Sequence, residues 1–228
     1  MMKKRRSNFA KDDIEAVKAR ERVLTMIDAI EPKELINAIK RAPSLRGMIL
    51  GYIAEEMFEQ HLPMTYPGIL AEHIQKHDEH KRDKNKSDRT IHYQGNFCRI
   101  QLKSIQTNSI CRDITSGKLR AIVQNDGSDA RKILLPNGSK IITTCYLRGE
   151  YDVLAVPLFP FVGKWEYAYK LNTDCRASES PKYLPKDAKH LLATTEPITW
   201  PLSQNWHTNL LQVMGKLNSS KQSIVVVS

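Results

Sequence analysis

The feature of the sequence that most constrains the fold is a run of alternating polar and apolar residues between Asp88 and Ser104. The run has two halves, which are separated by Gln94-Gly95-Asn96. Alternation with a period of two predicts β-strands, and Gly95-Asn96 suits the tight turn of a hairpin. We therefore predict a β-hairpin with one polar face and one largely apolar face, the apolar face packing on a helix.

The polar face of this hairpin brings together residue types that suit phosphodiester hydrolysis. With Gly95 and Asn96 as the turn residues, Asp88 lies opposite Lys103 and diagonal to Gln101. A turn shifted by one position places Asp88 opposite Gln101 on the same face, whereas an odd loop separates the side chains. Hydrolysis needs hard oxygen ligands for a divalent cation and a base or cation that orients the attacking water. A surface salt bridge between Asp88 and Lys103 is the alternative interpretation.

A helix is predicted before the hairpin, over residues 45–61, because Pro43-Ser44 supplies a stop and an N-cap. Its apolar residues form one stripe at helical spacing, which consists of Leu45, Met48, Ile49, Tyr52 and Ile53. Glu55 lies at the edge of this stripe, and Glu56 lies inside it. Either carboxylate is a candidate ligand for a metal at the hairpin, and a solvated helix face is the alternative for each.

Two parts of the hairpin resemble the pattern of the PD-(D/E)XK nuclease superfamily. They are Asp88 on the first strand and Gln101-Leu102-Lys103 on the second. That pattern is an Asp at the start of one strand and a [Glu/Asp/Gln]-x-Lys on the next. The resemblance implies a metal-dependent DNA endonuclease in which Asp88 and Gln101 bind Mg²⁺. It also implies that Lys103 orients or activates the attacking water and that cleavage releases a 3′-hydroxyl.

The helix acid of the superfamily has a counterpart in the spacing from Gly51 to Glu55, which resembles the arrangement in several such nucleases. This spacing favours Glu55 as the third Mg²⁺ ligand, with Glu56 as the second choice. Many members of the superfamily carry Glu where this chain has Gln101. An amide ligates through its oxygen but adds no charge, and one unit charge at close range is worth up to roughly 4 kcal/mol, so a weaker metal affinity is expected.

Three longer stretches, 101–109, 149–156 and 199–202, resemble a group of prokaryotic type II restriction enzymes. This narrower resemblance implies a three-layer α/β/α core with a mixed central sheet, and a homodimer that cuts a short site in double-stranded DNA in the cytoplasm of a prokaryotic cell. Two rival hypotheses stay open. One is a homing endonuclease or junction resolvase of the same superfamily, and the other is a DNA-binding module without catalysis.

The charge balance favours a nucleic acid as the partner of this chain. It has 35 basic and 25 acidic residues and a net charge of +10, which suits binding to a polyanion. Polar residues on and just after the second strand of the hairpin are candidates for DNA contacts: Arg99, Ser104, Gln106, Thr107 and Asn108. An exposed strand residue and an ordinary polar loop are the alternative interpretations.

The remaining sequence predicts an N-terminal helical arm, residues 1–43, and a nuclease-like domain, residues 44–228. The arm is helical from about residue 9, with a break at Glu31-Pro32. Further strands are predicted at 132–135, 141–146, 151–156 and 165–171. The four cysteines are scattered and are expected to be reduced thiols rather than zinc ligands. The longest apolar stretch, 153–162, is too short to span a membrane, and no signal peptide is recognised, so a soluble protein is expected.

Overall fold

The computed structural model describes residues 18, 21, 22, 25, 28–72, 87–203 and 205–225. Contacts divide the chain into two compact units, Met1–Arg46 and Gly47–Ser228. The boundary falls inside helix α3 (Pro43–Thr65), so the predicted division after residue 43 stays a prediction. In the first unit, helix α2 (Pro32–Arg41) begins at the predicted break, because a proline ring fits the first turn of a helix. The earlier part of the predicted arm lies largely outside the described residues.

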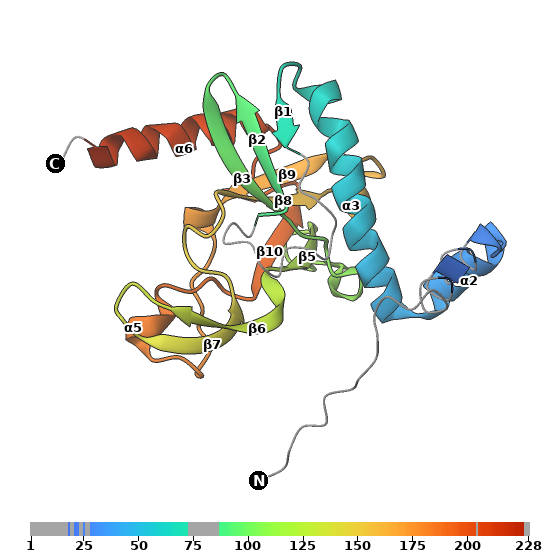
Figure 1. Cartoon of the computed structure of the whole chain (residues 1–228), viewed down its shortest axis with the longest axis horizontal. Helices are drawn as coiled ribbons and strands as arrows, with labels where there is room; N and C mark the ends of the chain where they lie inside the picture. Colours follow the sequence, from blue (N-terminus) through green and yellow to red (C-terminus); the bar gives the residue numbers. More distant parts are fainter. Residues whose placement is uncertain are drawn as a thin grey trace, which may run out of the picture. The chain divides into compact units, whose positions relative to one another are not determined.

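The second unit is built around a mixed five-stranded sheet with the order β1-β2-β3-β8-β9 (Figure 1). Strands β3 and β8 are parallel, and the other neighbours are antiparallel. The bounds are β1 Leu70–Glu72, β2 Arg89–Tyr93, β3 Asn96–Leu102, β8 Val153–Pro157 and β9 Tyr167–Leu171. Strand β8 is buried along its whole length, as expected for a central strand with both faces covered. The predicted α/β class with a mixed central sheet is confirmed.

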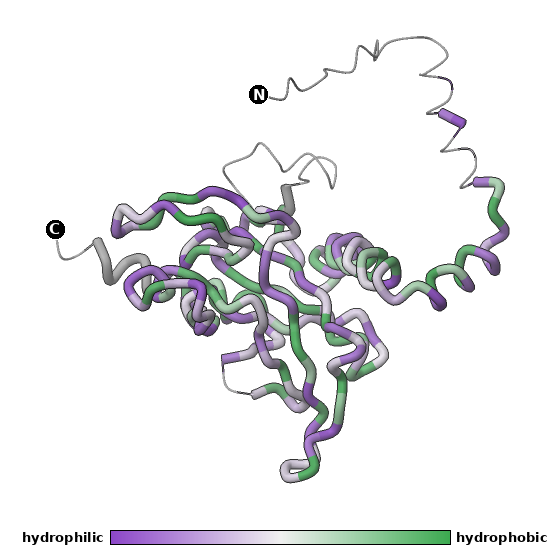
Figure 2. The backbone as a smooth tube through the Cα atoms, turned by 90° about the horizontal axis from the view of Figure 1, so that it is seen from below, coloured by the Kyte–Doolittle hydropathy of each residue, from purple (hydrophilic) through white to green (hydrophobic). Residues whose placement is uncertain are grey.

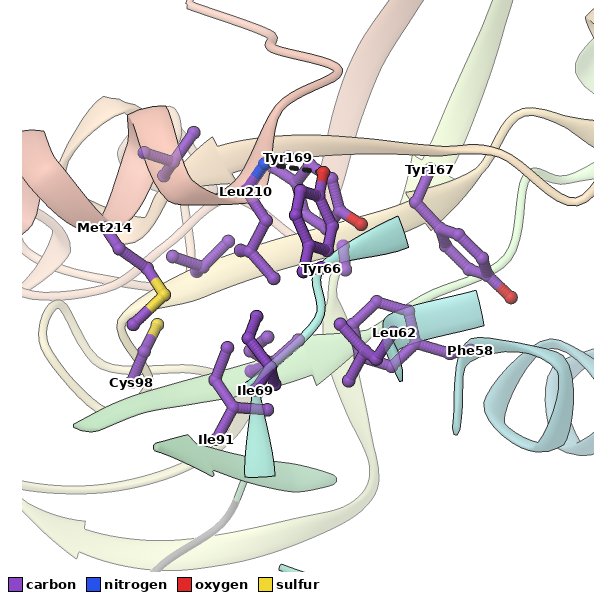
Figure 3. Packing of buried hydrophobic residues seen from close by; sticks show 14 of the residues in the cluster. Phe58, Leu62, Tyr66, Ile69, Ile91, Cys98, Tyr167, Tyr169, Leu210 and Met214 are labelled. Atoms are coloured by element: carbon purple, nitrogen blue, oxygen red, sulfur yellow. Dashed lines mark hydrogen bonds between the residues drawn. The ribbon is translucent and has the colours of Figure 1, made fainter. Parts of the chain in front are cut away.

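Helices α3 and α6 (Leu210–Val225) both pack on one face of this sheet. Phe58 and Leu62 of α3 meet Ile91 of β2 and Met214 of α6 in the same buried cluster (Figure 3). Burying each large apolar side chain contributes roughly 1.5–3 kcal/mol. Tyr66, just after α3, accepts a hydrogen bond from the backbone N–H of Leu210 at 3.0 Å. The apolar face of the hairpin therefore packs on helices, as the alternating pattern predicts. Figure 2 shows that hydrophilic and hydrophobic residues intermingle along the described backbone.

The other face of the central sheet is covered by a second sheet, which has three strands in the order β10-β5-β4. Val123 of β5 and Ile198 of β10 pack there against Leu154 and Val156 of β8. The bounds are β4 Cys111–Arg112, β5 Leu119–Gln124 and β10 Thr195–Trp200. The three-layer α/β/α prediction placed helices on this face, whereas the structure has a β-sheet there. Strands β4 and β5 of this layer lie in the connection from β3 to β8, and β10 follows β9 along the chain.

Strands β6 (Asp126–Leu134) and β7 (Lys140–Cys145) form a separate two-stranded ribbon. The turn between them contains Gly138, whose φ of 84° is left-handed and suits glycine. The predicted strands at 132–135, 141–146, 151–156 and 165–171 are confirmed as parts of β6, β7, β8 and β9. The short helices are α4 (Phe159–Val162), α5 (Pro185–Ala188), η2 (Thr107–Ser109) and η3 (Asn172–Asp174).

The hairpin of β2 and β3 forms as predicted, but its turn is displaced by one residue. Tyr93 pairs with Asn96, so the two turn residues are Gln94 and Gly95 and not Gly95 and Asn96. Both have positive φ, 50° and 78°, which is the backbone that a two-residue turn between twisted strands requires. Continuing this register places Asp88 opposite Gln101, so the predicted opposition of Asp88 and Lys103 is wrong. The side chains of Asp88, Gln101 and Lys103 keep the common face, because the displacement preserves the alternation.

Candidate metal and nuclease site

Asp88 and Gln101 are in direct contact at the point where β2 begins. The Oδ2 atom of Asp88 accepts a hydrogen bond from the backbone N–H of Leu102 at 2.7 Å. The same oxygen accepts a hydrogen bond from the Nε2 atom of Gln101. The register of the hairpin produces this contact, because it sets the two residues on opposite strands. The structure therefore brings together two of the predicted site residues.

The side-chain amide of Gln101 is buried, and only one of its two polar atoms has a hydrogen-bond partner within the described residues. Gln101 is 2% exposed. Among the residues that the structure describes, its Oε1 atom has no hydrogen-bond partner, and the same holds for the neighbouring Oγ atom of Ser87. A buried acceptor left in this state costs roughly 1–3 kcal/mol. This position is one where an additional donor or a cation would be stabilised.

Lys103 follows directly on β3 and points into the same region. Its Nζ atom donates a hydrogen bond to the backbone oxygen of Asp126 at 2.9 Å and lies 5.3 Å from the centroid of the Tyr146 ring. Burial lowers the pKa of Lys103, but Tyr146, Asp88 and Asp126 together outweigh burial and raise this pKa above its ordinary value. Lys103 is therefore a fixed cation close to Asp88.

Arg89 connects two acidic residues of α3, Glu55 and Glu59, to this region. The sequence pattern had placed Arg89 on the apolar face of the hairpin. Arg89 is buried, and its Nη1 atom donates to the backbone oxygen of Asp88 at 2.7 Å. The Nη1 atom lies 3.8 Å from Oε2 of Glu55, and Nε lies 2.6 Å from Oε1 of Glu59. Glu55 is half-buried and faces the hairpin, whereas Glu56 is exposed. A charged residue inside an apolar pattern was the signal in the sequence that could have revealed Arg89.

Arg99 is held by the protein itself. Its Nε and Nη2 atoms donate to the two carboxylate oxygens of Asp152, each at 3.1 Å. Its remaining contacts are with the backbone oxygens of Gly149 and Glu150. Hydrogen bonding to Asp152 raises the pKa of Arg99. Asp152 is thus a buried, paired carboxylate, and the expected DNA contact of Arg99 stays a prediction.

The other predicted DNA contacts lie on the segment that leaves β3. Ser104 Oγ donates to the backbone oxygen of Leu50 in α3 at 3.4 Å. Gln106 Nε2 donates to Gln124 Oε1 at 2.7 Å. Thr107 and Asn108 are exposed in η2. The segment thus bridges α3 and β5 and offers only its outer end to solvent.

The donor atoms of the site suit Mg²⁺ better than zinc. Within the described part of the chain, no three or more His, Cys, Asp or Glu side chains come together as a metal-binding group. The candidates are the carboxylates of Asp88 and Glu55 and the amide oxygen of Gln101, which are hard oxygen ligands. Mg²⁺ keeps several waters and is usually held by one or two carboxylates, so this donor set fits it. The described cysteines are all free thiols.

Comparisons with known proteins leave the family open. No family model matches the chain, and no curated protein matches it. Among solved structures, a match covers 62% of this chain and 85% of a bacterial homing endonuclease, I-Ssp6803I, at 12% identity and a TM-score of 0.32. A TM-score this low does not establish a common fold. As for membranes, none of the helices in the described ranges has the length and apolar character that a membrane crossing needs.

Proposed function

We propose that this chain is a Mg²⁺-dependent endonuclease that hydrolyses phosphodiester bonds of double-stranded DNA. The observation that carries the proposal is the buried Oε1 atom of Gln101, which has no hydrogen-bond partner in the described residues and belongs to the amide that contacts Asp88. A lysine ammonium lies two residues further along the same chain segment. A carboxylate, an amide oxygen and a fixed cation are the parts that this hydrolysis needs.

Asp88, Gln101 and Glu55 are the residues that would hold the cation. In the structure Gln101 turns its NH₂ group toward Asp88. The two ends of an amide have nearly the same shape, so a half-turn of this group presents its oxygen beside the Asp88 carboxylate. Because this oxygen has no hydrogen-bond partner among the described residues, it loses no hydrogen bond in the turn. Glu55 forms an ion pair with Arg89, which also donates a hydrogen bond to the backbone oxygen of Asp88. When bound, Mg²⁺ supplies charge stabilisation at the phosphate and lowers the pKa of a coordinated water.

Lys103 has the role of a fixed cation in this proposal. Its ammonium is oriented by the backbone oxygen of Asp126 and by the ring of Tyr146. A preorganised ammonium stabilises negative charge that develops on the phosphate and orients the attacking water. The net charge of +10 supports a polyanionic substrate. We extend the proposal to a type II restriction enzyme that acts as a homodimer in the prokaryotic cytoplasm, on the basis of the sequence resemblance alone.

The test incubates phage-sized linear duplex DNA with the protein and either Mg²⁺ or EDTA. The decisive variant is Asp88→Asn, because its amide oxygen still accepts the Leu102 N–H while the charge is lost. Asp113→Asn is the matched control, since Asp113 lies in an exposed turn and bonds to Ser116. Discrete fragments are expected from the wild type and the control, only with Mg²⁺, and not from Asp88→Asn.

Other outcomes would contradict specific parts of the proposal. A smear would exclude sequence-specific cleavage, and cutting of a four-way junction in preference to the linear duplex would indicate a resolvase. Salt-sensitive binding without any Mg²⁺-dependent cutting would indicate a DNA-binding module, and the enzyme proposal would then fail.

A further inference from the structure

The ribbon of β6 and β7 has two faces of very different character. Arg131, Ile133, Ile141 and Thr143 are partly or fully buried, and the two isoleucines pack on the small cluster around Leu135. The opposite face is exposed and consists of two cross-strand pairs, Lys132 with Ile142 and Leu134 with Lys140. Leu134 is 62% exposed and Ile142 is 69% exposed. Two large aliphatic side chains thus point outward between two lysines.

The base of this ribbon is attached to the candidate site. Asp126, the first residue of β6, binds the ammonium of Lys103 through its backbone oxygen. The ring of Tyr146, directly after β7, lies 5.3 Å from Lys103 Nζ and 5.7 Å from the guanidinium carbon of Arg131. Arg131 in turn pairs with Glu150. The ribbon therefore starts beside the cation that the proposed chemistry uses.

The turn of the ribbon is also held in place. Asn137 Nδ2 donates to the Oδ1 atom of Asp187 at 2.7 Å and to the backbone oxygen of Lys186 at 3.1 Å. Contacts at both ends fix the direction of the exposed face before any ligand binds. Preorganisation of this kind reduces the ordering cost of association.

We propose that the exposed face of the β6–β7 ribbon lies in the major groove of the duplex DNA and takes part in sequence recognition. This inference rests on the proposed function, because it takes the DNA beside Lys103 as the ligand. The major groove is about 12 Å wide and admits a two-stranded β-ribbon. Lys132 and Lys140 complement the charge of phosphates and of guanine acceptor atoms, while Leu134 and Ile142 suit thymine methyl groups.

The composition of the face distinguishes DNA from a protein partner. The exposed face, Lys132, Leu134, Lys140 and Ile142, has two basic residues and no acid. Each exposed aliphatic residue stands opposite a lysine, so the face has no continuous apolar centre. Lysine is depleted in the cores of protein interfaces, whereas basic side chains dominate DNA contacts. Charge complementarity therefore favours DNA as the occupant.

The first experiment measures binding of the full chain to a fluorescein-labelled mixed-sequence duplex of about 30 base pairs by anisotropy. It is performed in EDTA, so that cleavage does not enter. The double variant Lys132→Ala/Lys140→Ala is compared with Lys118→Ala/Lys164→Ala, which removes the same charge from exposed positions elsewhere. For the ribbon variant we expect at least about a tenfold loss of affinity and a salt dependence whose slope falls by about two. The control should stay within about twofold of the wild type.

The second experiment tests sequence recognition by selection from a randomised duplex pool. Leu134→Ser/Ile142→Ser should enrich a different or weaker sequence than the wild type while retaining most of its nonspecific affinity. Both side chains are exposed, so thermal unfolding should be nearly unchanged, and this measurement confirms that the variants fold.

Several outcomes would overturn the inference. Equal affinity and equal salt dependence of the two lysine variants would exclude the ribbon from the DNA interface, and so would absence of DNA binding by the wild type. If Leu134→Ser/Ile142→Ser changes the oligomeric state and leaves the selected sequence unchanged, the face is a protein interface. If the wild type binds through the ribbon but never cuts with Mg²⁺, the proposed enzyme fails and the ribbon inference stands.

Discussion

Two carboxylate clusters lie along the same strand, β3, and differ in how completely their polar atoms are used. Around Asp152, both carboxylate oxygens accept hydrogen bonds from Arg99, and the other guanidinium donors reach backbone oxygens. Two residues further along, the Asp88 and Gln101 cluster keeps the buried Oε1 atom of Gln101 without a partner among the described residues. In the first cluster the Asp152 carboxylate and the Arg99 guanidinium satisfy each other, so the cluster has a structural role. The second retains an oxygen that can bind a ligand, and this difference separates a structural site from a candidate functional one.

The largest expected effect comes from removing the cation of the second cluster. Lys103→Met should lower the rate of Mg²⁺-dependent cleavage by about 10²–10³-fold, because a preorganised charge at the phosphate is lost. Single-turnover cleavage assays measure this loss, and DNA binding in EDTA provides the reference. Lys118→Met, at an exposed position, is the control and should cut at the wild-type rate. A cleavage rate of Lys103→Met within a factor of two or three of wild type would remove Lys103 from the site.

A substitution in the first cluster should change the stability of the protein and not the cleavage reaction. Asp152→Ala leaves the guanidinium of Arg99 partly buried and unpaired, and we expect a loss of about 2–3 kcal/mol in the free energy of unfolding. Urea denaturation followed by circular dichroism measures it. Asp129→Ala, at an exposed position of β6, should change stability by less than about 0.5 kcal/mol. A neutral result for Asp152→Ala would show that the two clusters do not differ as described.

A smaller effect is expected when the second cluster is made fully acidic. Gln101→Glu sets a second carboxylate beside Asp88, so the variant should lose about 1 kcal/mol of stability in EDTA through like-charge repulsion. Mg²⁺ should reverse this loss and bind about tenfold or more tightly than to the wild type. Thermal unfolding with and without Mg²⁺ tests both statements. Gln212→Glu, exposed on α6, should show neither change.

The smallest effect involves His61, which belongs to neither cluster and packs against Tyr167. Burial lowers the pKa of His61, although Glu166 acts in the opposite direction. The unfolded chain therefore binds a proton near pH 6.5 before the folded chain does, so stability is complete above this pH and falls below it. Between pH 7 and pH 5, the free energy of unfolding of the wild type should fall more than that of His61→Gln, as measured by urea denaturation at each pH. Identical pH profiles would contradict this assignment.

Much of the candidate site could be predicted from the sequence because it depends on local alternation. Asp88, Gln101 and Lys103 share a face in any hairpin with an even turn, and the displaced turn did not change that. The turn itself was predicted one residue late, because Gln94 adopts a positive φ that residue preferences assign to Gly or Asn. The Gln101 oxygen is left without a partner in the described part of the chain by three-dimensional packing, and no sequence pattern encodes it.

The layer over the second face of the sheet could not be predicted for a different reason. Strand β10 pairs with β5 across more than seventy residues, as in Thr199 with Arg120. Pairing over such a distance leaves no local signal, and β5 has only a short alternation of its own. The ion pairs of Arg89 could not be predicted for the same reason, because its partners Glu55 and Glu59 come from a helix.

The parallel pairing of β3 with β8 determines when the candidate site forms during folding. Gln101 pairs with Leu154, about fifty residues later in the sequence, and Lys103 donates its backbone N–H to Ala155. Closing so long a loop is slow compared with forming the local hairpin. A nascent chain on the ribosome therefore completes β2 and β3 well before β8 emerges to support them. We expect incomplete translation products that end before β8 to lack the proposed cleavage activity.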